Sequence, residues 1–143
     1  LHFLVLLLTV YLLMCVKSFY SFDLAKDNDA IKYIHKDCLL HWNSSKGYRC
    51  SDYKMIKERI ETLKKAFHSF NYKLSHLLED NNTITARYTV YVTSIEKPDE
   101  EEPLAHFITV WEVKEGKLYR GFEISQLADE NSQNLNSFSE IKV

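Results

Sequence analysis

The run HFITVWEVKEGKLYRGFEI, from His106 to Ile124, constrains the fold of this chain more than any other stretch. Apolar and polar side chains alternate on both sides of Glu115 and Gly116, which is the period-two pattern of β-strands. A glycine in a two-residue loop is typical of a tight β-hairpin. The sequence therefore predicts two antiparallel strands that are joined at Glu115 and Gly116.

The register of this hairpin decides which side chains face the core. With a two-residue loop, Val113 lies opposite Leu118, and Trp111 lies opposite Arg120. A one-residue bulge in the loop would place Glu112 beside Leu118 and bury a carboxylate, so the hydrophobic pattern favours the first register. The inner face of the hairpin is then expected to hold Phe107, Thr109, Trp111, Val113, Leu118, Arg120, Phe122 and Ile124.

Two helices and two further strands precede the hairpin in this prediction. Apolar residues recur at helical spacing from Asp27 to Trp42 and again from Tyr53 to Phe70, where Ser51 is the expected N-cap. Residues 72–78 and 84–92 alternate with period two and predict an antiparallel pair of strands. The sequence therefore predicts an α+β domain in which two N-terminal helices pack on a four-stranded antiparallel sheet.

The first eighteen residues, LHFLVLLLTVYLLMCVKS, contain no Asp, Glu, Lys or Arg before Lys17. This apolar run is shorter than the roughly 20 residues of a membrane-spanning helix and fits the hydrophobic region of a secretory signal. Val16 and Ser18 suit a cleavage site before Phe19. We therefore expect residues 1–18 to be a signal peptide of a secreted, extracellular protein without stable membrane insertion. An uncleaved anchor and a buried helix are the alternatives.

Export changes what the cysteines and asparagines imply. Removal of the signal takes Cys15 away and leaves Cys38 and Cys50, which predict a disulfide. Two free thiols are the alternative if the chain is cytosolic. Sequons at Asn43 and Asn81 agree with export and predict N-glycosylation.

Charge and motifs argue against several classes of function. With 18 basic and 20 acidic residues, the chain lacks the basic surface of a nucleic-acid-binding protein. It has no paired Cys/His spacing, phosphate-binding loop or HExxH helix. The acidic run from Asp99 to Glu102 lacks the alternating ligand spacing of a calcium loop. We therefore expect neither a metal nor a cofactor.

The predicted inner face of the sheet contains no Asp or Glu, which favours binding over acid–base catalysis. His76 is the candidate base, with a core or rim histidine as the simpler interpretation. Arg120 is the candidate cation, with a side chain reaching out from the sheet edge as the simpler interpretation. Candidate ligand-binding residues are Trp42, His76, Tyr88, Thr109, Trp111, Arg120 and Phe122.

The order of helices and strands, closed by this hairpin, resembles the nuclear transport factor 2-like, or SnoaL-like, superfamily. The resemblance is carried by Trp111, Val113, Glu115, Gly116, Lys117, Leu118 and Phe122. It implies a strongly curved, cone-like sheet with a pocket at its open end, often in a dimer. Where enzymes of the family place a pocket acid, three residues after the aromatic of the last strand, this chain has Ser125. A cystatin-like arrangement is the second choice of fold.

These observations give one leading hypothesis and one alternative. The leading hypothesis is a secreted, non-enzymatic domain over residues 19–128 that binds a small apolar ligand or a protein partner. A second copy of the chain, paired through the outer sheet face with Ile108 and Val110, is one such partner. The alternative is an isomerase- or dehydratase-like enzyme that uses His76 as its base. Residues 129–143 are expected to form a flexible polar tail.

Overall fold

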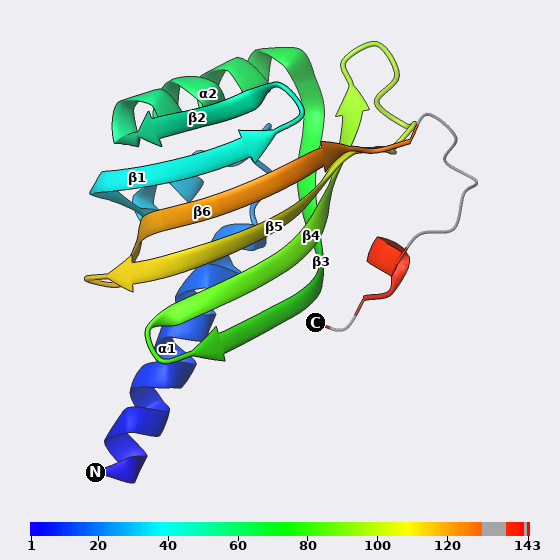
Figure 1. Ribbon diagram of the computed structural model, residues 1–143. Coiled ribbons are helices and arrows are strands. Elements are labelled where there is room, and N and C mark those ends of the chain that lie inside the picture. The colour runs from blue at the N-terminus through cyan, green and yellow to red at the C-terminus, as the bar shows by residue number, and fades with distance from the viewer. Residues whose placement is uncertain (130–136, 142) are drawn as a thin grey trace.

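The computed structural model describes residues 1–129, 137–141 and 143. Figure 1 shows two helices arranged around a twisted sheet, with α1 crossing behind it and α2 running along its β2 edge. In chain order the elements are α1 (His2–Tyr20), the 3-10 helix η1 (Ala30–Tyr33), β1 (Ile34–Ser44), β2 (Gly47–Asp52), α2 (Tyr53–Ala66), β3 (Phe67–Asp80), β4 (Thr83–Ser94), β5 (Glu102–Lys114), β6 (Lys117–Leu127) and the 3-10 helix η2 (Ser137–Ser139).

The sheet has six strands in the order β2-β1-β6-β5-β4-β3. It is mixed, because β1 runs parallel to β6 while the other neighbours are antiparallel. The predicted α+β class is confirmed, but the expectation of four antiparallel strands after two N-terminal helices was inexact. Of the two additional strands, β1 comes mostly from the region in which the first helix was predicted, and β2 comes from the segment between the two predicted helices.

The segment from Asp27 to Trp42 forms η1 and most of β1 rather than a helix. Its apolar residues Ile34, Cys38 and Trp42 lie four positions apart, a spacing that fits a helical repeat and a strand repeat equally well. Leu40 is buried between Cys38 and Trp42, so the strand period of two describes the segment. The helical prediction failed because the pattern was ambiguous.

The second predicted helix is α2, which is shorter than expected. Asp52 rather than Ser51 caps it, because Asp52 Oδ1 accepts a hydrogen bond from the Met55 backbone N–H at 2.9 Å. The helix ends before Phe67, which already pairs with β4 as the first residue of β3. The apolar positions of the helix and of the strand follow each other without a break, so the sequence pattern did not reveal this boundary.

The turn of the last hairpin is the predicted one. Glu115 and Gly116 have positive φ angles of 54° and 72°, as a type I′ turn requires. Val113 pairs with Leu118 on either side of the turn, in agreement with the expected register. The strands that follow the turn depart from that register after this pair.

A bulge at Tyr119 shifts the pairing along the rest of the hairpin. Glu112 lies opposite Arg120, and Trp111 lies opposite Gly121, one position from the predicted register. The Trp111 ring packs on Gly121 so closely that a Cβ at this glycine would lie 2.6 Å from Trp111 Cζ3. Gly121 thus provides the space that the tryptophan needs.

The bulge exchanges the two faces of β6. Phe122 and Ile124, which were predicted to be inside, are 47% and 60% exposed. Arg120, also predicted inside, lies on the other face, where its Nη1 donates to the Asp37 carbonyl oxygen at 2.7 Å. Glu123, predicted outside, turns inward instead. The predicted acid-free inner face was therefore wrong.

A second bulge has the same effect on β3. The strand pairs with β4 up to Leu74 and again from His76, which leaves Ser75 as an extra residue. Beyond it Leu77 packs against the core, whereas Leu78 is 60% exposed. The inward position predicted for His76 was therefore wrong.

The predicted disulfide is also wrong, because Cys38 and Cys50 are both free. Cys50 pairs with His41 in the β1–β2 ladder and shares its face of the sheet. Cys38 lies on the opposite face, in the core with Leu40. Burial raises the pKa of the Cys38 thiol to about 12, so it behaves as a core side chain.

The two sequons lie at hairpin ends. Asn43 is exposed near the end of β1, and Asn81 lies in the β3–β4 turn with a φ of 58°. Their glycosylation stays a prediction.

The described part of the C-terminal tail packs on the outer sheet face. The Phe138 ring stacks on His106 at 4.5 Å between centroids, and the Arg87 guanidinium lies 3.6 Å from the Phe138 centroid. Arg87 Nη2 also donates to Ser137 Oγ at 2.7 Å. The remaining residues of the predicted flexible tail, 130–136 and 142, lie outside the described residues.

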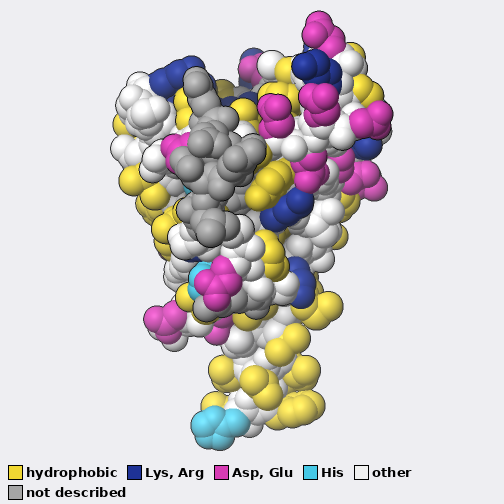
Figure 2. Space-filling view, turned by 90° about the vertical axis from the view of Figure 1, so that its right-hand side faces the viewer, with side chains coloured by type: hydrophobic (Ala, Val, Ile, Leu, Met, Phe, Trp, Pro, Cys, Tyr) yellow, Lys and Arg dark blue, Asp and Glu magenta, His cyan; other side chains and the backbone are white. Residues whose placement is uncertain are grey.

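Helix α1 has an exposed half and a buried half. Figure 2 shows the first half as an apolar projection below the body of the domain. The second half contributes Leu12, Val16, Phe19 and Tyr20 to the core. The helix is long and apolar enough to span a membrane, a property shared by signal sequences and core helices. Cleavage before Phe19, which stays a prediction, would remove the fully buried Val16 from the core.

A matched pair of substitutions measures how much α1 contributes to the folded protein. Val16→Ala is expected to lower the free energy of unfolding by about 2 kcal/mol, because about 0.8 kcal/mol is lost per buried CH2 in addition to a cavity term. Val5→Ala, at a position that is 60% exposed, is expected to change it by less than about 0.5 kcal/mol. Urea denaturation measures both values, and equal values would show that α1 does not pack as described.

Candidate functional site

A cavity of about 300 Å³ lies between the two helices and the inner face of the sheet. Most of its wall is apolar or aromatic. The charged side chains that line it are Lys46, Arg59 and Glu123. The aromatic residues of the wall are Phe19, Tyr20, Trp42, Phe70, Tyr72, Tyr88, Phe107 and Trp111.

Glu123 supplies the carboxyl group of the cavity. Its Oε1 accepts hydrogen bonds from the Tyr88 hydroxyl at 2.8 Å and from Thr109 Oγ1 at 2.7 Å. Among the described residues, no hydrogen bond reaches Oε2 and no cation lies within 4 Å of the carboxyl group. In that part of the chain every fully buried side-chain oxygen has a hydrogen-bond partner, so Oε2, which has none, is not fully buried. Oε2 is therefore open to a molecule in the cavity.

Burial raises the pKa of Glu123 above its ordinary value. Hydrogen bonds from Thr109 and Tyr88, together with the positive charge of Arg59, act in the opposite direction but do not cancel the effect of burial. Glu123 therefore holds its proton to a higher pH than an exposed glutamate does. A carboxyl group in this state can give a proton to a bound molecule or take one from it.

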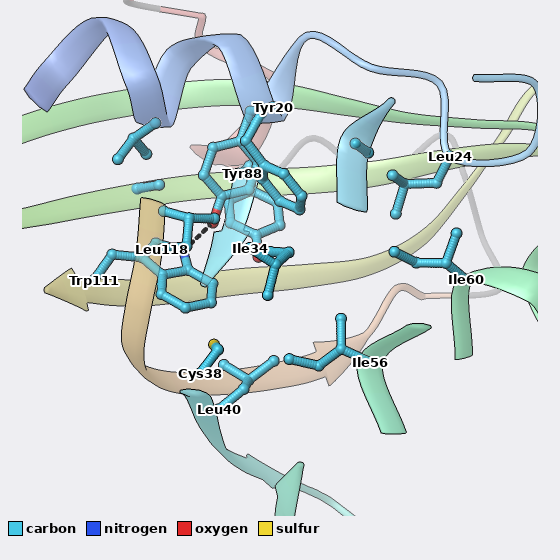
Figure 3. Packing of buried hydrophobic residues seen from close by; sticks show 14 of the residues in the cluster. Tyr20, Leu24, Ile34, Cys38, Leu40, Ile56, Ile60, Tyr88, Trp111 and Leu118 are labelled. Carbon is cyan, nitrogen blue, oxygen red and sulfur yellow. Dashed lines mark hydrogen bonds between the residues drawn. The ribbon is translucent and has the colours of Figure 1, made fainter. Parts of the chain in front are cut away.

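Neutral tyrosine hydroxyls surround this carboxyl group. Burial raises the pKa values of Tyr20, Tyr72 and Tyr88. The ring of Tyr88 lies 4.7 Å from that of Tyr20 and 5.3 Å from that of Tyr72. Figure 3 shows Tyr20 beside Tyr88 and marks the 2.8 Å hydrogen bond from Trp111 Nε1 to the Tyr20 hydroxyl. Because these phenols stay neutral they act as hydrogen-bond donors, and the Tyr88 hydroxyl already donates its proton to Glu123.

The Tyr72 hydroxyl is available to form a hydrogen bond with a ligand. This hydroxyl makes no hydrogen bond to another described residue. Among these residues, every fully buried side-chain nitrogen or oxygen atom has a hydrogen-bond partner, so the Tyr72 hydroxyl is not fully buried. The residue lines the cavity. Its O–H group is therefore available to an acceptor on a bound molecule.

Arg59 reaches the cavity from α2. Its Nη2 donates to Ser51 Oγ at 2.7 Å, and its guanidinium lies 5.2 Å from the centre of the Trp42 ring. Within the described part of the chain, no carboxylate comes within 4 Å of it. Burial, followed by the nearby charge of Arg49, lowers the pKa of Arg59 from its very high ordinary value. The group remains a cation, because an arginine pKa starts above about 12.

The structure brings together only some of the ligand-binding residues predicted from the sequence. Trp42, Tyr88 and Trp111 line the cavity. Thr109 is fully buried beside it and donates to Glu123. Phe122 is outside, where its ring stacks on His41 at 5.2 Å between centroids.

The two candidate polar residues, His76 and Arg120, do not line the cavity. The bulge at Ser75 displaces His76, whose Nδ1 lies 3.0 Å from Ser75 Oγ. The bulge at Tyr119 displaces Arg120, whose guanidinium lies 3.9 Å from the centre of the Tyr119 ring. Alternation alone placed both side chains one position out of phase.

Sequence reasoning missed Glu123 and Arg59 as site residues. Arg59 lies on the predicted second helix, where no site residue was predicted. For Glu123 a signal was present, because Gly121 lies inside the predicted strand near an aromatic-rich partner. A glycine within a strand often marks a bulge or a close contact of the backbone. That interpretation would have turned Glu123 inward.

Comparison with known proteins identifies the family. A family model described as a SnoaL-like domain matches residues 16–121. The chain belongs to the SnoaL-like family. The predicted resemblance to SnoaL-like and nuclear transport factor 2-like proteins is thus confirmed, and the match includes the end of α1. No curated protein matches this SnoaL-like chain in sequence.

Solved structures share the fold of this SnoaL-like domain at low sequence identity. A phenazine biosynthesis-related protein from Pseudomonas aeruginosa has a TM-score of 0.66 and 12% identity, with coverage of 92% of this chain and 91% of that protein. An LEH-like epoxide hydrolase from M. tuberculosis has a TM-score of 0.64 and 13% identity over 82% and 84%. A putative polyketide cyclase from Streptomyces antibioticus has a TM-score of 0.56 and 13% identity over 76% and 84%.

The raised pKa of Glu123 predicts a pH-dependent stability difference. Its folded-state pKa lies above the unfolded value, so its contribution to folding is complete below the unfolded pKa and is lost as pH rises through the folded pKa. Glu123→Gln lacks this dependence. The melting temperature of the variant relative to the wild type should therefore increase between about pH 4 and pH 8. Thermal unfolding followed by circular dichroism measures it, and a constant difference would contradict the buried environment.

Proposed function

We propose that this SnoaL-like domain binds a small, largely apolar molecule in its cavity and that Glu123 transfers a proton to or from it. The supporting observation is the position of Glu123 itself. Its Oε1 is fixed by two hydroxyl groups and its Oε2 is open to an apolar space. An apolar surround with a positioned carboxyl group is the arrangement that general acid–base catalysis uses.

The arrangement fits removal of a proton from a carbon next to a carbonyl group. Glu123 in its ionised form would accept that proton. The Tyr72 hydroxyl, which is a neutral donor on the same cavity wall, would stabilise the negative charge that develops on the carbonyl oxygen. Isomerisation, cyclisation and dehydration of small carbonyl compounds all contain such a step.

This proposal differs from the non-enzymatic interpretation of the sequence, because the premise of that interpretation was wrong. That interpretation depended on an inner face without carboxylates, and Glu123 lies there. The alternative base, His76, is separated from the cavity by the bulge in β3. The names of two structural neighbours, an epoxide hydrolase and a putative polyketide cyclase, agree with small-molecule chemistry on this fold. Fold alone does not determine activity. Secretion and pairing through the outer sheet face stay predictions from the sequence.

Proton exchange into 2-tetralone provides a direct test. This bicyclic ketone is small and apolar, and its hydrogen atoms beside the carbonyl exchange with D2O when a base removes them. The wild-type protein is expected to accelerate deuterium incorporation, followed by NMR. Glu123→Gln is expected to lower the catalysed rate by about 100-fold or more, in the range typical of a lost general base.

His76→Ala serves as the matched control, because it removes a titratable group that does not line the cavity. Its exchange rate should equal that of the wild type. Loss of exchange in this variant but not in Glu123→Gln would assign the base to His76 and reject the proposal. Binding of 2-tetralone without exchange would show a binding domain without proton transfer.

A further inference from the structure

We infer that the cavity selects flat, apolar molecules that carry a carboxylate group, and that Arg59 is the residue that recognises this group. The inference specifies the ligand class of the proposed site, and it rests on the cavity being a binding site but not on proton transfer by Glu123. Three features of the described residues support it: the charge of the lining, the way Arg59 is held, and the aromatic wall beside it.

The charge of the lining favours an anion. Lys46 and Arg59 are its cations and Glu123 is its one acid among the described residues. Two positive charges therefore face at most one negative charge, and a protonated Glu123 leaves both uncompensated. Arg49 is close enough to affect the Arg59 guanidinium and adds to the positive potential. An anionic group that enters the cavity meets a net attraction.

Arg59 is held in place without using up its donors. Its Nη2 bonds to Ser51 Oγ, a group with no exposed surface, and its guanidinium packs on Trp42. Trp42 is fixed in turn by a 2.8 Å hydrogen bond from its Nε1 to Ser125 Oγ. A guanidinium has five N–H donors and binds carboxylates through two parallel hydrogen bonds. A positioned, partly buried arginine without a carboxylate partner is therefore a receptor for one.

A row of aromatic rings runs from Trp42, which packs against Arg59, to Tyr88. Trp42 stacks on Phe107 with 6.5 Å between centroids and an interplanar angle of 28°. Phe107 stacks on Tyr88 at 5.2 Å and 9°, and Tyr88 donates to Glu123. A bound aromatic ring can contact these side chains in the offset-stacked or edge-to-face arrangements that aromatic pairs prefer. A ligand with its carboxylate at Arg59 would place its ring system among these aromatic side chains.

Calorimetric titration with 2-naphthoate and 2-naphthamide tests the inference. The two probes share one planar ring system and differ in charge. Wild-type protein at neutral pH is expected to bind 2-naphthoate about tenfold more tightly than 2-naphthamide, because charge-assisted hydrogen bonds are about twice as strong as neutral ones. Equal affinity, a preference for the amide, or no binding of either probe would overturn the inference.

Variants on α2 locate the source of the preference. Arg59→Met should abolish it, whereas Arg59→Lys should keep part of it because the charge remains. Lys57→Met removes one exposed positive charge from the same helix, outside the cavity lining, and should keep the full preference. Thermal unfolding of each variant verifies that it is folded. A preference that survives in folded Arg59→Met would reject the assignment to Arg59.

The two proposals fail separately. Glu123→Gln should keep or strengthen the preference for 2-naphthoate, because it leaves Arg59 in place and removes a negative charge that acts on the guanidinium. If the wild-type protein prefers 2-naphthoate but does not exchange 2-tetralone hydrogens, the carboxylate site is supported and the proton-transfer function is rejected. If the protein exchanges 2-tetralone hydrogens but binds both naphthalene probes equally, the proton-transfer function is supported and the carboxylate site at Arg59 is rejected.

Discussion

The packing of the Trp111 ring on the backbone of Gly121 is the contact on which the candidate site depends. A Cβ at position 121 would lie 2.6 Å from both the tryptophan ring and Leu40 Cδ1, so glycine alone leaves room for them. The bulge at Tyr119 brings this glycine opposite Trp111. Two residues further along β6, the same register places Glu123 opposite Thr109 and turns its carboxyl group into the cavity.

The inward carboxyl group opposes folding, and the surrounding hydroxyl groups only partly offset this effect. Burial raises the pKa of Glu123 despite hydrogen bonds from Tyr88 and Thr109. Placing a carboxyl group in a largely apolar wall without an ion pair is costly for stability. Exceptions to the rules of good packing tend to lie at functional sites. The energetic disadvantage of Glu123 is therefore itself a reason to connect it with chemistry.

Much of the sheet could be predicted from the sequence, but the site residues depend on details that alternation does not contain. The period-two runs located β4 and both strands of the last hairpin, and Gly116 located its turn. Bulges at Ser75 and Tyr119 add one residue each, and a single added residue exchanges the faces of all that follow. Tyr88 and Trp111 were found because no bulge separates them from the positions that set their face, whereas Trp42 was predicted at the end of a helix that the structure replaces with β1. Glu123 was missed by one position, and β1 was missed because its apolar spacing of four also fits a helix.

Helix α1 contains the predicted signal cleavage site and also contributes residues to the cavity. Its last turn supplies Phe19 and Tyr20 to the cavity wall, and the Tyr20 hydroxyl accepts the Trp111 N–H at 2.8 Å. Val16, one turn earlier, is fully buried and holds that turn against the domain. Cleavage before Phe19 would leave Tyr20, the partner of Trp111, in the chain but would remove Val16, which holds this turn against the domain. The apolar helix that resembles a signal in sequence is therefore, in the folded chain, part of the core and of the cavity wall in which Glu123 lies.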